Sequence, residues 1–392
     1  MKPAIGRQRI AGVRQEHVDP WLLFAMLSLL AIGIVFVTSA SLSIAESEYG
    51  LPFYYTRKQA LFTIAGLLAA VFAWIMPLRF WQASRGVLLL AAFGLLMMVL
   101  VPGIGYEVNG SIRWIRFGPV GVQASEPARL FIYIYLAAYM VKRQEEVLTS
   151  FGGFIRPLLL VFSASLLLLA EPDFGAALVL LATALAMFFI GGVRLRDLTV
   201  LLSVAMLVFI GLAMSSSYRL QRLTGFLDPW ADPFNSGFQL TQSLIAIGRG
   251  EWVGVGLGAS VQKLFYLPEA HTDFVFAVIA EETGLFGSLV VIGLYLLLVS
   301  RIFAIAATAA RREQMFGAYL SWGIGTWIGL QAFINLGVNM GVLPTKGLTL
   351  PFVSAGGSSL LVCCFAIGLV MRVARECQES DRDLWLRKEV MA

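Results

Sequence analysis

The chain passes from a polar loop into an apolar segment at LPEAHTDFVF, residues Leu267–Phe276. The polar part ends at Asp273, and the long apolar run that begins at Phe274 predicts a membrane helix. One of the two histidines of the chain, His271, lies two residues before Asp273. Ionisable side chains beside a bilayer are scarce and usually functional, so this carboxylate at the mouth of a membrane helix is the first candidate for chemistry.

The composition indicates a membrane protein, because 58% of the residues are hydrophobic and only 14% are charged. Apolar runs of about 20 residues, each long enough to cross a bilayer core of roughly 30 Å, recur along the chain. We predict an all-α polytopic membrane protein with ten transmembrane helices. The predicted spans are Trp21–Ile44, Gln59–Met76, Gly86–Val101, Pro127–Val141, Pro157–Ala170, Phe174–Val193, Leu198–Met214, Phe274–Ser300, Phe316–Val342 and Leu350–Arg372. The first span is longer than the apolar part of a cleaved signal peptide, which indicates a signal anchor.

Lysine and arginine set the expected orientation, since they accumulate on the cytoplasmic side of membrane proteins. With a cytoplasmic amino terminus, 19 of the 29 Lys and Arg face inward and 10 face outward. Both termini are therefore expected in the cytoplasm. This bias also explains the net charge of +5 without a nucleic-acid partner. The three cysteines, Cys363, Cys364 and Cys377, fall in the last span and the inner tail, so no disulfide framework is expected.

The predicted domain organisation has three parts. Residues 1–20 form a cytoplasmic segment, 21–375 the transmembrane domain, and 376–392 a cytoplasmic tail. A large extracytoplasmic loop, 215–273, joins the seventh and eighth helices and contains a helix-like stretch at Phe238–Gly248. A second long outward loop covers Pro102–Glu126. Loops longer than about 12–15 residues are usually functional, so chemistry is expected at the outer membrane–water boundary.

Asp273 is the most specific candidate. It lies 28 residues above the inner Arg301, which corresponds to roughly 42 Å along a continuous helix. This distance exceeds the bilayer core of roughly 30 Å, so we expect Asp273 at the outer face, hydrated and ionised. A carboxylate there can act as a general base towards a hydroxyl. The structural alternative is an N-cap for the helix that follows, and the two roles are compatible.

Other carboxylates near the outer boundary have two interpretations. Glu281 and Glu282 lie two turns deeper than Asp273. They are either residues of a functional site or partners of an arginine from a neighbouring loop. Asp173 lies in the break Glu171–Gly175 between two spans, where it is a site residue or the N-cap of the next helix.

Uncharged and basic groups are equally ambiguous. Gln331, Asn335 and Asn339 recur every four residues and share one helix face, which favours interhelical hydrogen bonds over a substrate groove. Five cations are predicted to face outward, and each has two interpretations: it binds an anionic ligand, or it reaches lipid headgroups. They are Arg219, Arg222, Arg249, Lys263 and Lys346. No metal motif such as HExxH is present. The sequence leaves open whether a divalent cation, Mg²⁺ or Mn²⁺, is held by carboxylates and a diphosphate.

Taken together, these stretches resemble one family over nearly the whole chain, the SEDS polytopic membrane proteins (shape, elongation, division, sporulation), and within it the division branch of FtsW proteins. The stretches that carry the resemblance are Asn109–Ile115, Gln123–Arg129, Glu171–Gly175, Phe226–Pro229, Gln242–Gly248, Lys263–Phe274, Pro344–Pro351 and Gly356–Ser359. The chain departs from the family at Arg129, where elongation members often carry Lys, and at Ala355, where many members carry Tyr.

The resemblance implies a peptidoglycan glycosyltransferase that polymerises lipid II into β-1,4-linked glycan strands. It implies that Asp273 is the family's essential loop aspartate and that Glu126, Arg129 and Asp173 line its central cavity. The predicted substrate-binding set also includes Arg219, Arg222, Lys263, Lys346 and Ser358. The reaction needs a base for the attacking hydroxyl and cations for the departing diphosphate. Since an α-linked donor gives a β-linked product, the mechanism inverts and needs no covalent intermediate.

The resemblance also implies partners and a location. The partners are a class B penicillin-binding transpeptidase (FtsI) and the divisome proteins FtsQ, FtsL and FtsB, in the bacterial inner membrane at the division septum. Two other functions stay open, a lipid II flippase and a non-catalytic division scaffold. A flippase needs charges deep in the membrane, whereas the inner halves of the predicted spans are almost free of ionisable groups.

Overall fold

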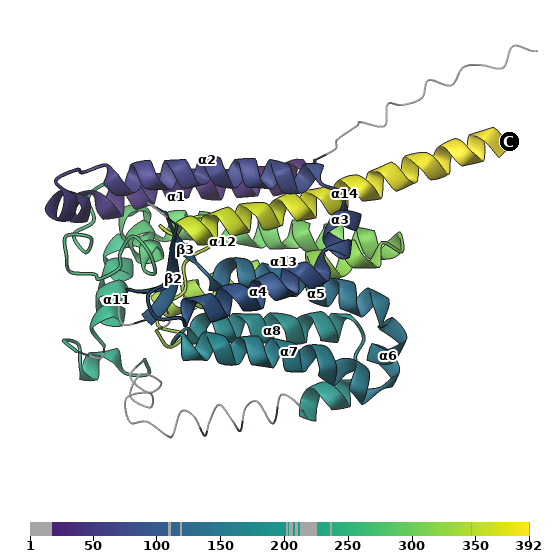
Figure 1. Cartoon of the computed structure of the whole chain (residues 1–392). Helices are drawn as coiled ribbons and strands as arrows, with labels where there is room; N and C mark the ends of the chain where they lie inside the picture. Colours follow the sequence, from purple (N-terminus) through teal and green to yellow (C-terminus); the bar gives the residue numbers. More distant parts are fainter. Residues whose placement is uncertain are drawn as a thin grey trace, which may run out of the picture.

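The computed structural model describes residues 18–108, 111–117, 120–200, 226–235, 237–345 and 347–391, together with residues 203, 207 and 211. Its helices lie side by side in a bundle (Figure 1). Within this part of the chain, five helices are long and apolar enough to cross a membrane, and two shorter helices are also apolar. The five are α1 (Pro20–Tyr49), α2 (Tyr54–Ile75), α7 (Phe151–Ala170), α12 (Val275–Arg311) and α14 (Gly357–Met391), and the two are α4 (Arg85–Val99) and α8 (Phe174–Ile190). A mostly helical, polytopic architecture is thus confirmed.

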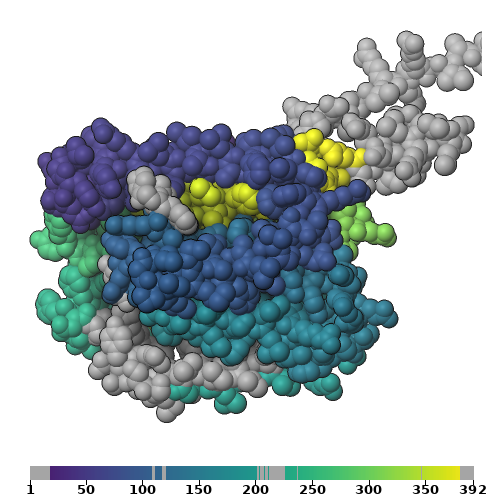
Figure 2. All heavy atoms as spheres, viewed as in Figure 1, coloured from purple at the N-terminus to yellow at the C-terminus, as the bar shows by residue number. Residues whose placement is uncertain are grey.

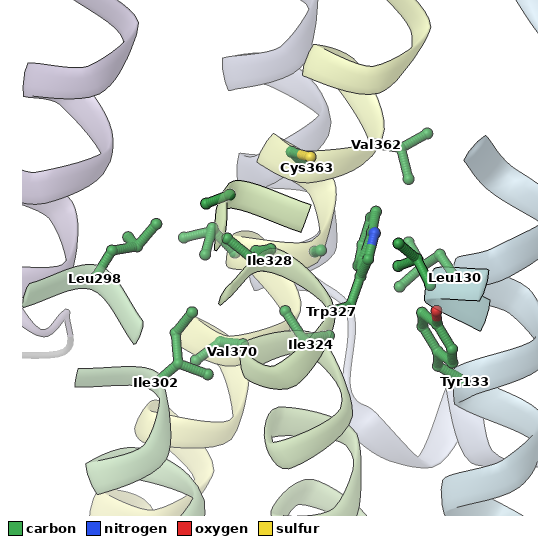
Figure 3. Close-up of a cluster of buried hydrophobic side chains, with 14 of the residues drawn as sticks. Leu130, Tyr133, Leu298, Ile302, Ile324, Trp327, Ile328, Val362, Cys363 and Val370 are labelled. Atoms are coloured by element: carbon green, nitrogen blue, oxygen red, sulfur yellow. The ribbon is translucent and has the colours of Figure 1, made fainter. Parts of the chain in front are cut away.

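The centre of the bundle is α13 (Met315–Asn339), which packs against α12, α14, α8 and α5 (Ser125–Lys142). Figure 3 shows the apolar side chains that meet there, with Leu130 and Tyr133 from α5 on one side of Trp327 and Leu298 and Ile302 from α12 on the other. In Figure 2 the atoms of α14 are visible between those of α2 and those of the segment containing α3 (Leu78–Ala83) and α4. Because apolar helices surround α13, the polar side chains of α13 can form hydrogen bonds only with other parts of the protein.

One end of the bundle carries the longer connections. There the loop helix α11 (Phe238–Gly250), the 3₁₀ turn η1 (Pro229–Ala231) and a small sheet gather, whereas α6 (Gln144–Thr149) lies at the other end (Figure 1). The predicted helix-like stretch in the large loop is therefore confirmed. Most of the seventh predicted span, Leu198–Met214, and the loop start at 215–225 lie outside the described residues.

The all-α prediction is wrong in one region, the connection between α4 and α5. It forms an antiparallel sheet in the order β1 (Gly105–Val108), β2 (Ser111–Phe117) and β3 (Val120–Gln123). In the register of the sheet, Trp114 pairs with Tyr106 on one side and with Gln123 on the other. Strands of four to seven residues carry too little periodicity to stand out against long helices. The sheet matters because β3 leads directly into α5.

Several predicted helix boundaries differ from the structure, and two helix starts affect the ends of the bundle. The fifth predicted span began at Pro157, but α7 begins at Phe151 because Ser150 caps it, its Oγ accepting from the Gly153 N–H at 3.0 Å. The last predicted span began at Leu350, but α14 begins at Gly357, after a series of turns. These turns leave residues 347–356 free to cover the end of the bundle.

The predicted straight helix above Arg301 is also wrong, because α12 breaks at Gly284. This residue has φ 66° and ψ −160°, which L-residues with a side chain rarely adopt. An added Cβ would lie only 2.4 Å from the Gly254 backbone nitrogen. The rise counted along one axis therefore does not give the position of Asp273, which belongs to the short segment before the break.

Backbone hydrogen bonds between the large loop and α12 replace those that the break removes. The amides of Val255 and Gly256 donate to the carbonyls of Glu281 and Glu282, and those of Leu285 and Phe286 donate to the carbonyls of Glu251 and Trp252, at 2.9–3.2 Å. The loop is thus fastened to the first part of α12 by its main chain.

A substitution of Gly284 tests this account of the break. Gly284→Ala should lower the melting temperature of the purified protein in detergent, because the positive φ costs about 1–2 kcal/mol and the new Cβ meets backbone. Gly293→Ala is the matched control on the same helix, since nothing lies within 4 Å of a Cβ there. The control should be neutral or slightly stabilising. Equal melting temperatures for the two variants would contradict a required glycine at the break.

Candidate functional site

A small recess opens at the end of the bundle that carries the sheet. Its empty space is about 230 Å³, part of which is open to solvent. Its lining comes from four segments that are distant in sequence: β3, the first turns of α5 and of α8, and the loop before α14. The lining residues are Gln123, Glu126, Arg129, Asp173, Ala176, Gly347, Leu348 and Thr349. The structure thus brings together three of the predicted site residues, Glu126, Arg129 and Asp173.

An ion pair forms the floor of this recess. The Arg129 Nη2 lies 2.6 Å from Glu126 Oε1, one turn apart on α5, and both side chains are buried. Arg129 Nη1 donates to Gln331 Oε1 at 3.3 Å, and the guanidinium lies 5.4 Å from the centre of the Trp327 ring. Removing one partner of such a buried pair strongly destabilises the folded protein, because the other charge stays buried without compensation.

Asp173 has both of the roles considered from the sequence. It caps α8, since its Oδ1 accepts from the Ala176 N–H at 3.1 Å. Its Oδ2 accepts from Gln123 Nε2 and Ser125 Oγ, each at 3.3 Å. Arg113 of β2 approaches it, with 3.7 Å between Nη1 and Oδ1. This arginine was absent from the predicted site because its position depends on the unpredicted sheet.

Asp273 lies at the edge of the recess, beside Gly347. An added Cβ at Gly347 would lie 3.3 Å from Asp273 Oδ2. The predicted N-cap is wrong, because α12 has no side-chain cap at its start and Phe274 holds the cap position. The Asp273 carboxylate makes no hydrogen bond or ion pair within the described part of the chain. Its side chain is half-buried and lies next to Gly347, which lines the recess.

The expectation that Asp273 stays ionised holds only above neutral pH. Burial raises the pKa of Asp273 to about 7, the negative charge of Glu269 adds to the increase, and Arg113 partly opposes it. Glu171 at the end of α7 behaves similarly, since burial and the charge of Asp173 raise its pKa to about 8. Both carboxyls titrate near neutral pH, the range in which a general base is most effective.

The amide stripe of α13 makes the expected hydrogen bonds to neighbouring helices, with Arg129 of α5 and Ala277 of α12, and it also bonds to loops. Gln331 Nε2 donates to the Thr349 carbonyl at 3.0 Å. Asn335 Nδ2 donates to the carbonyls of Leu348, at 2.6 Å, and Asp273, at 2.8 Å. The stripe does not line the recess itself, but it holds the loops that do.

Glu281 and Glu282 belong to a separate buried cluster. Lys263 Nζ lies 2.8 Å from Glu282 Oε1 and also donates to Ser39 Oγ and the Gly258 carbonyl. Arg249 lies 3.5 Å from Glu281 Oε1, which confirms the predicted pairing with an arginine of a neighbouring loop. The cluster joins the large loop to α12 and α1.

The remaining predicted residues lie elsewhere. Ser358 joins α14 to the sheet, its Oγ accepting from the Gln123 N–H at 3.0 Å. His271 packs on Tyr55, with 4.7 Å between ring centres, and burial lowers its pKa. Arg219, Arg222 and Lys346 lie outside the described residues. Within those residues, no group of three or more His, Cys, Asp or Glu is placed to hold a metal ion.

A pair of matched variants tests the floor of the recess. Arg129→Met should reduce the free energy of unfolding by about 3–5 kcal/mol, because Glu126 then stays buried without its partner. Arg143→Met is the control, since it breaks an ion pair with Glu146 at the same helix spacing on an exposed surface. The control should change thermal melting little. Equal losses in the two variants would contradict a tightly coupled buried pair.

Comparisons with known proteins identify the family of the chain. The family model of FtsW, RodA and SpoVE, described as cell cycle proteins, matches residues 20–379. The chain is 55% identical over 370 residues to the probable peptidoglycan glycosyltransferase FtsW of Nitrosococcus halophilus, covering 94% of this chain and 95% of the relative. It is 52% identical to the protein of the same name from Coxiella burnetii, over 92% of this chain and 97% of that one.

Two solved structures are also similar to the chain. A chain of a complex described under "Structural coordination of polymerization and crosslinking by a peptidoglycan synthase complex" is similar with a TM-score of 0.76 and 31% identity, over 92% of this chain and 98% of the other. The rod shape determining protein RodA of Thermus thermophilus is similar with a TM-score of 0.66 and 29% identity, over 92% and 97% of the two chains.

Proposed function

The chain belongs to the FtsW/RodA/SpoVE family, and we propose that it is a peptidoglycan glycosyltransferase that polymerises lipid II with Asp273 as the general base. The observation that carries the proposal is the Asp273 carboxylate, which has no hydrogen-bond partner among the described residues and lies at the edge of a recess lined by buried charges. The relatives named peptidoglycan glycosyltransferase match it over nearly their whole length, which supports the same reaction class.

The reaction requires two opposite electrostatic functions. The acceptor hydroxyl gives its proton to the Asp273 carboxylate while its oxygen bonds to the anomeric carbon of the donor sugar. The bond from that carbon to the diphosphate breaks on the opposite face, and the diphosphate leaves with the electron pair. The configuration inverts in one step, so no enzyme nucleophile is needed. A carboxyl with a pKa near 7 is suited to the proton transfer.

The recess is better suited to the diphosphate than to a whole glycolipid headgroup. Its enclosed part is smaller than 230 Å³, because that volume includes space open to solvent. Gln123 lines the recess and Arg113 lies 3.7 Å from Asp173, another lining residue, so both can donate to phosphate oxygens, while the buried Arg129 supplies positive charge. The sugars would then lie outside the recess, over Asp273.

Charge balance indicates that a further cation takes part. Within the described part of the site, Glu126, Asp173 and Asp273 supply three carboxyls, against the two cations Arg113 and Arg129. A diphosphate added to this set needs more positive charge. Lys346 is the first candidate, because its neighbour Gly347 lines the recess, and a divalent cation is the second. Binding by Arg219, Arg222, Lys263 and Ser358 stays an untested prediction.

Sidedness and partners complete the proposal. We infer cytoplasmic termini, ten spans, and a site on the outer face at the division septum. The ion pair between Arg301 and Asp19, with 2.5 Å between Nη2 and Oδ2, supports a shared inner end for α1 and α12. The similar chain from a complex that polymerises and crosslinks supports a transpeptidase partner. FtsQ, FtsL and FtsB stay predicted divisome partners.

The direct test is Asp273→Asn. This isosteric change removes the base, so polymerisation of lipid II by the purified chain with its transpeptidase should fall at least 100-fold. Glu107→Gln on strand β1 is the control, since it neutralises an exposed outward carboxylate and should keep full activity. Glycan products are measured by gel electrophoresis. A normal rate in the Asn variant would refute the base, and an inactive wild type would refute the function.

The pH dependence gives a second test. Only ionised Asp273 accepts a proton, so its raised pKa means that activity is lost as the pH falls below about 7. The rate should decrease about tenfold per pH unit below that point and level off above pH 8. Glu269→Gln removes a neighbouring negative charge and should move the midpoint to lower pH. A profile that is flat from pH 5 to 9 would contradict the assignment.

A further inference from the structure

Two asparagines of α13 fix the main chain at Asp273. Asn335 Nδ2 and Asn339 Nδ2 donate to the Asp273 carbonyl at 2.8 Å and 3.0 Å. Asn339 Oδ1 accepts from the Ala277 N–H at 3.1 Å. Asn339 thus supplies from another helix the cap that α12 lacks at its own start. Both side chains are buried, so water does not compete for these bonds.

This arrangement determines where the Asp273 carboxylate lies. The carboxylate has no hydrogen-bond partner of its own within the described residues. Its position therefore depends on the orientation of the backbone that carries it. A carbonyl held by two donors fixes the following peptide plane, and the cap at Ala277 fixes the first turn of the helix.

The same face of α13 also forms hydrogen bonds with the segments that line the recess. Besides Asp273, Asn335 Nδ2 donates to the carbonyl of Leu348, which lines the recess. One turn away, Gln331 accepts from Arg129 and donates to the Thr349 carbonyl. Residues four apart on a helix lie above one another, so one rigid face sets the distance between the base and the wall opposite.

We propose that Asn335 and Asn339 are positioning residues for glycosyl transfer, which hold Asp273 and the recess wall in register. Asn339 acts on Asp273 and on the first turn of α12, whereas Asn335 acts on Asp273 and on the wall. The inference rests on the proposed function and adds to it the residues that place the base. A displacement of about 1 Å at a reacting group costs on the order of 100-fold in rate.

The test compares Asn339→Leu and Asn335→Leu with Ser243→Ala in the complex with the transpeptidase. Leucine matches asparagine in size and removes its hydrogen bonds. Ser243 Oγ donates to the Asn339 carbonyl at 2.8 Å, so the control breaks a buried bond to the same residue and leaves Asp273 untouched. If a leucine variant does not fold, the isosteric Asn339→Asp replaces it. Kinetics, melting temperature and hydrogen exchange of the peptide covering residues 271–280 are measured for each.

Asn339→Leu should lower kcat about 10- to 100-fold with little change in KM for lipid II. Asn335→Leu should lower kcat and also raise KM. Both should shift the midpoint of the pH profile and speed exchange at 271–280, and Ser243→Ala should do neither. A kcat within twofold of wild type for Asn339→Leu, or equal effects in Ser243→Ala, would overturn the proposal. A wild-type protein that does not polymerise lipid II would refute the proposed function. Hydrogen exchange would still test whether the two asparagines position the Asp273 backbone.

Discussion

A polar side chain inside an apolar bundle needs a protein partner, and this constraint shapes the centre of the molecule. The central helix α13 is enclosed by α5, α8, α12 and α14, yet carries three amides on one face. All three find their partners at the end of the bundle that carries the recess, mostly in backbone carbonyls. Because an unpaired buried amide costs about 1–3 kcal/mol, the same bonds that satisfy α13 also fold the loops over the recess.

The break in α12 has a related effect on the large loop. Main-chain hydrogen bonds join residues 251–256 to both sides of Gly284, and Lys263 and Arg249 pair with the two glutamates beside the break. The first segment of α12 is therefore attached to α13 at its start and to the large loop at its end. A partner that binds the large loop would therefore act on a segment that is physically joined to Asp273.

Much of the site could be predicted from sequence, but its geometry could not. Asp273 was identified because a carboxylate directly before a long apolar run is rare, and Asp173 because its motif interrupts two spans. The raised pKa of Asp273 depends on Glu269 and on burial at the end of the bundle, which no local pattern contains. Arg113 was missed because it reaches Asp173 only through a short sheet. Lys263 lies in an outward loop like the other cations, and only the tertiary fold pairs it with Glu282.

The central claim is that the diphosphate of the donor lies in the recess while its sugar lies over Asp273. An electron cryomicroscopy map of the complex with its transpeptidase and a non-reactive lipid II analogue tests this most directly. The account predicts density for the diphosphate within hydrogen-bond distance of Arg113 and Gln123, with the anomeric carbon on the Asp273 side. Diphosphate density on another face of the bundle, or a sugar remote from Asp273, would contradict it.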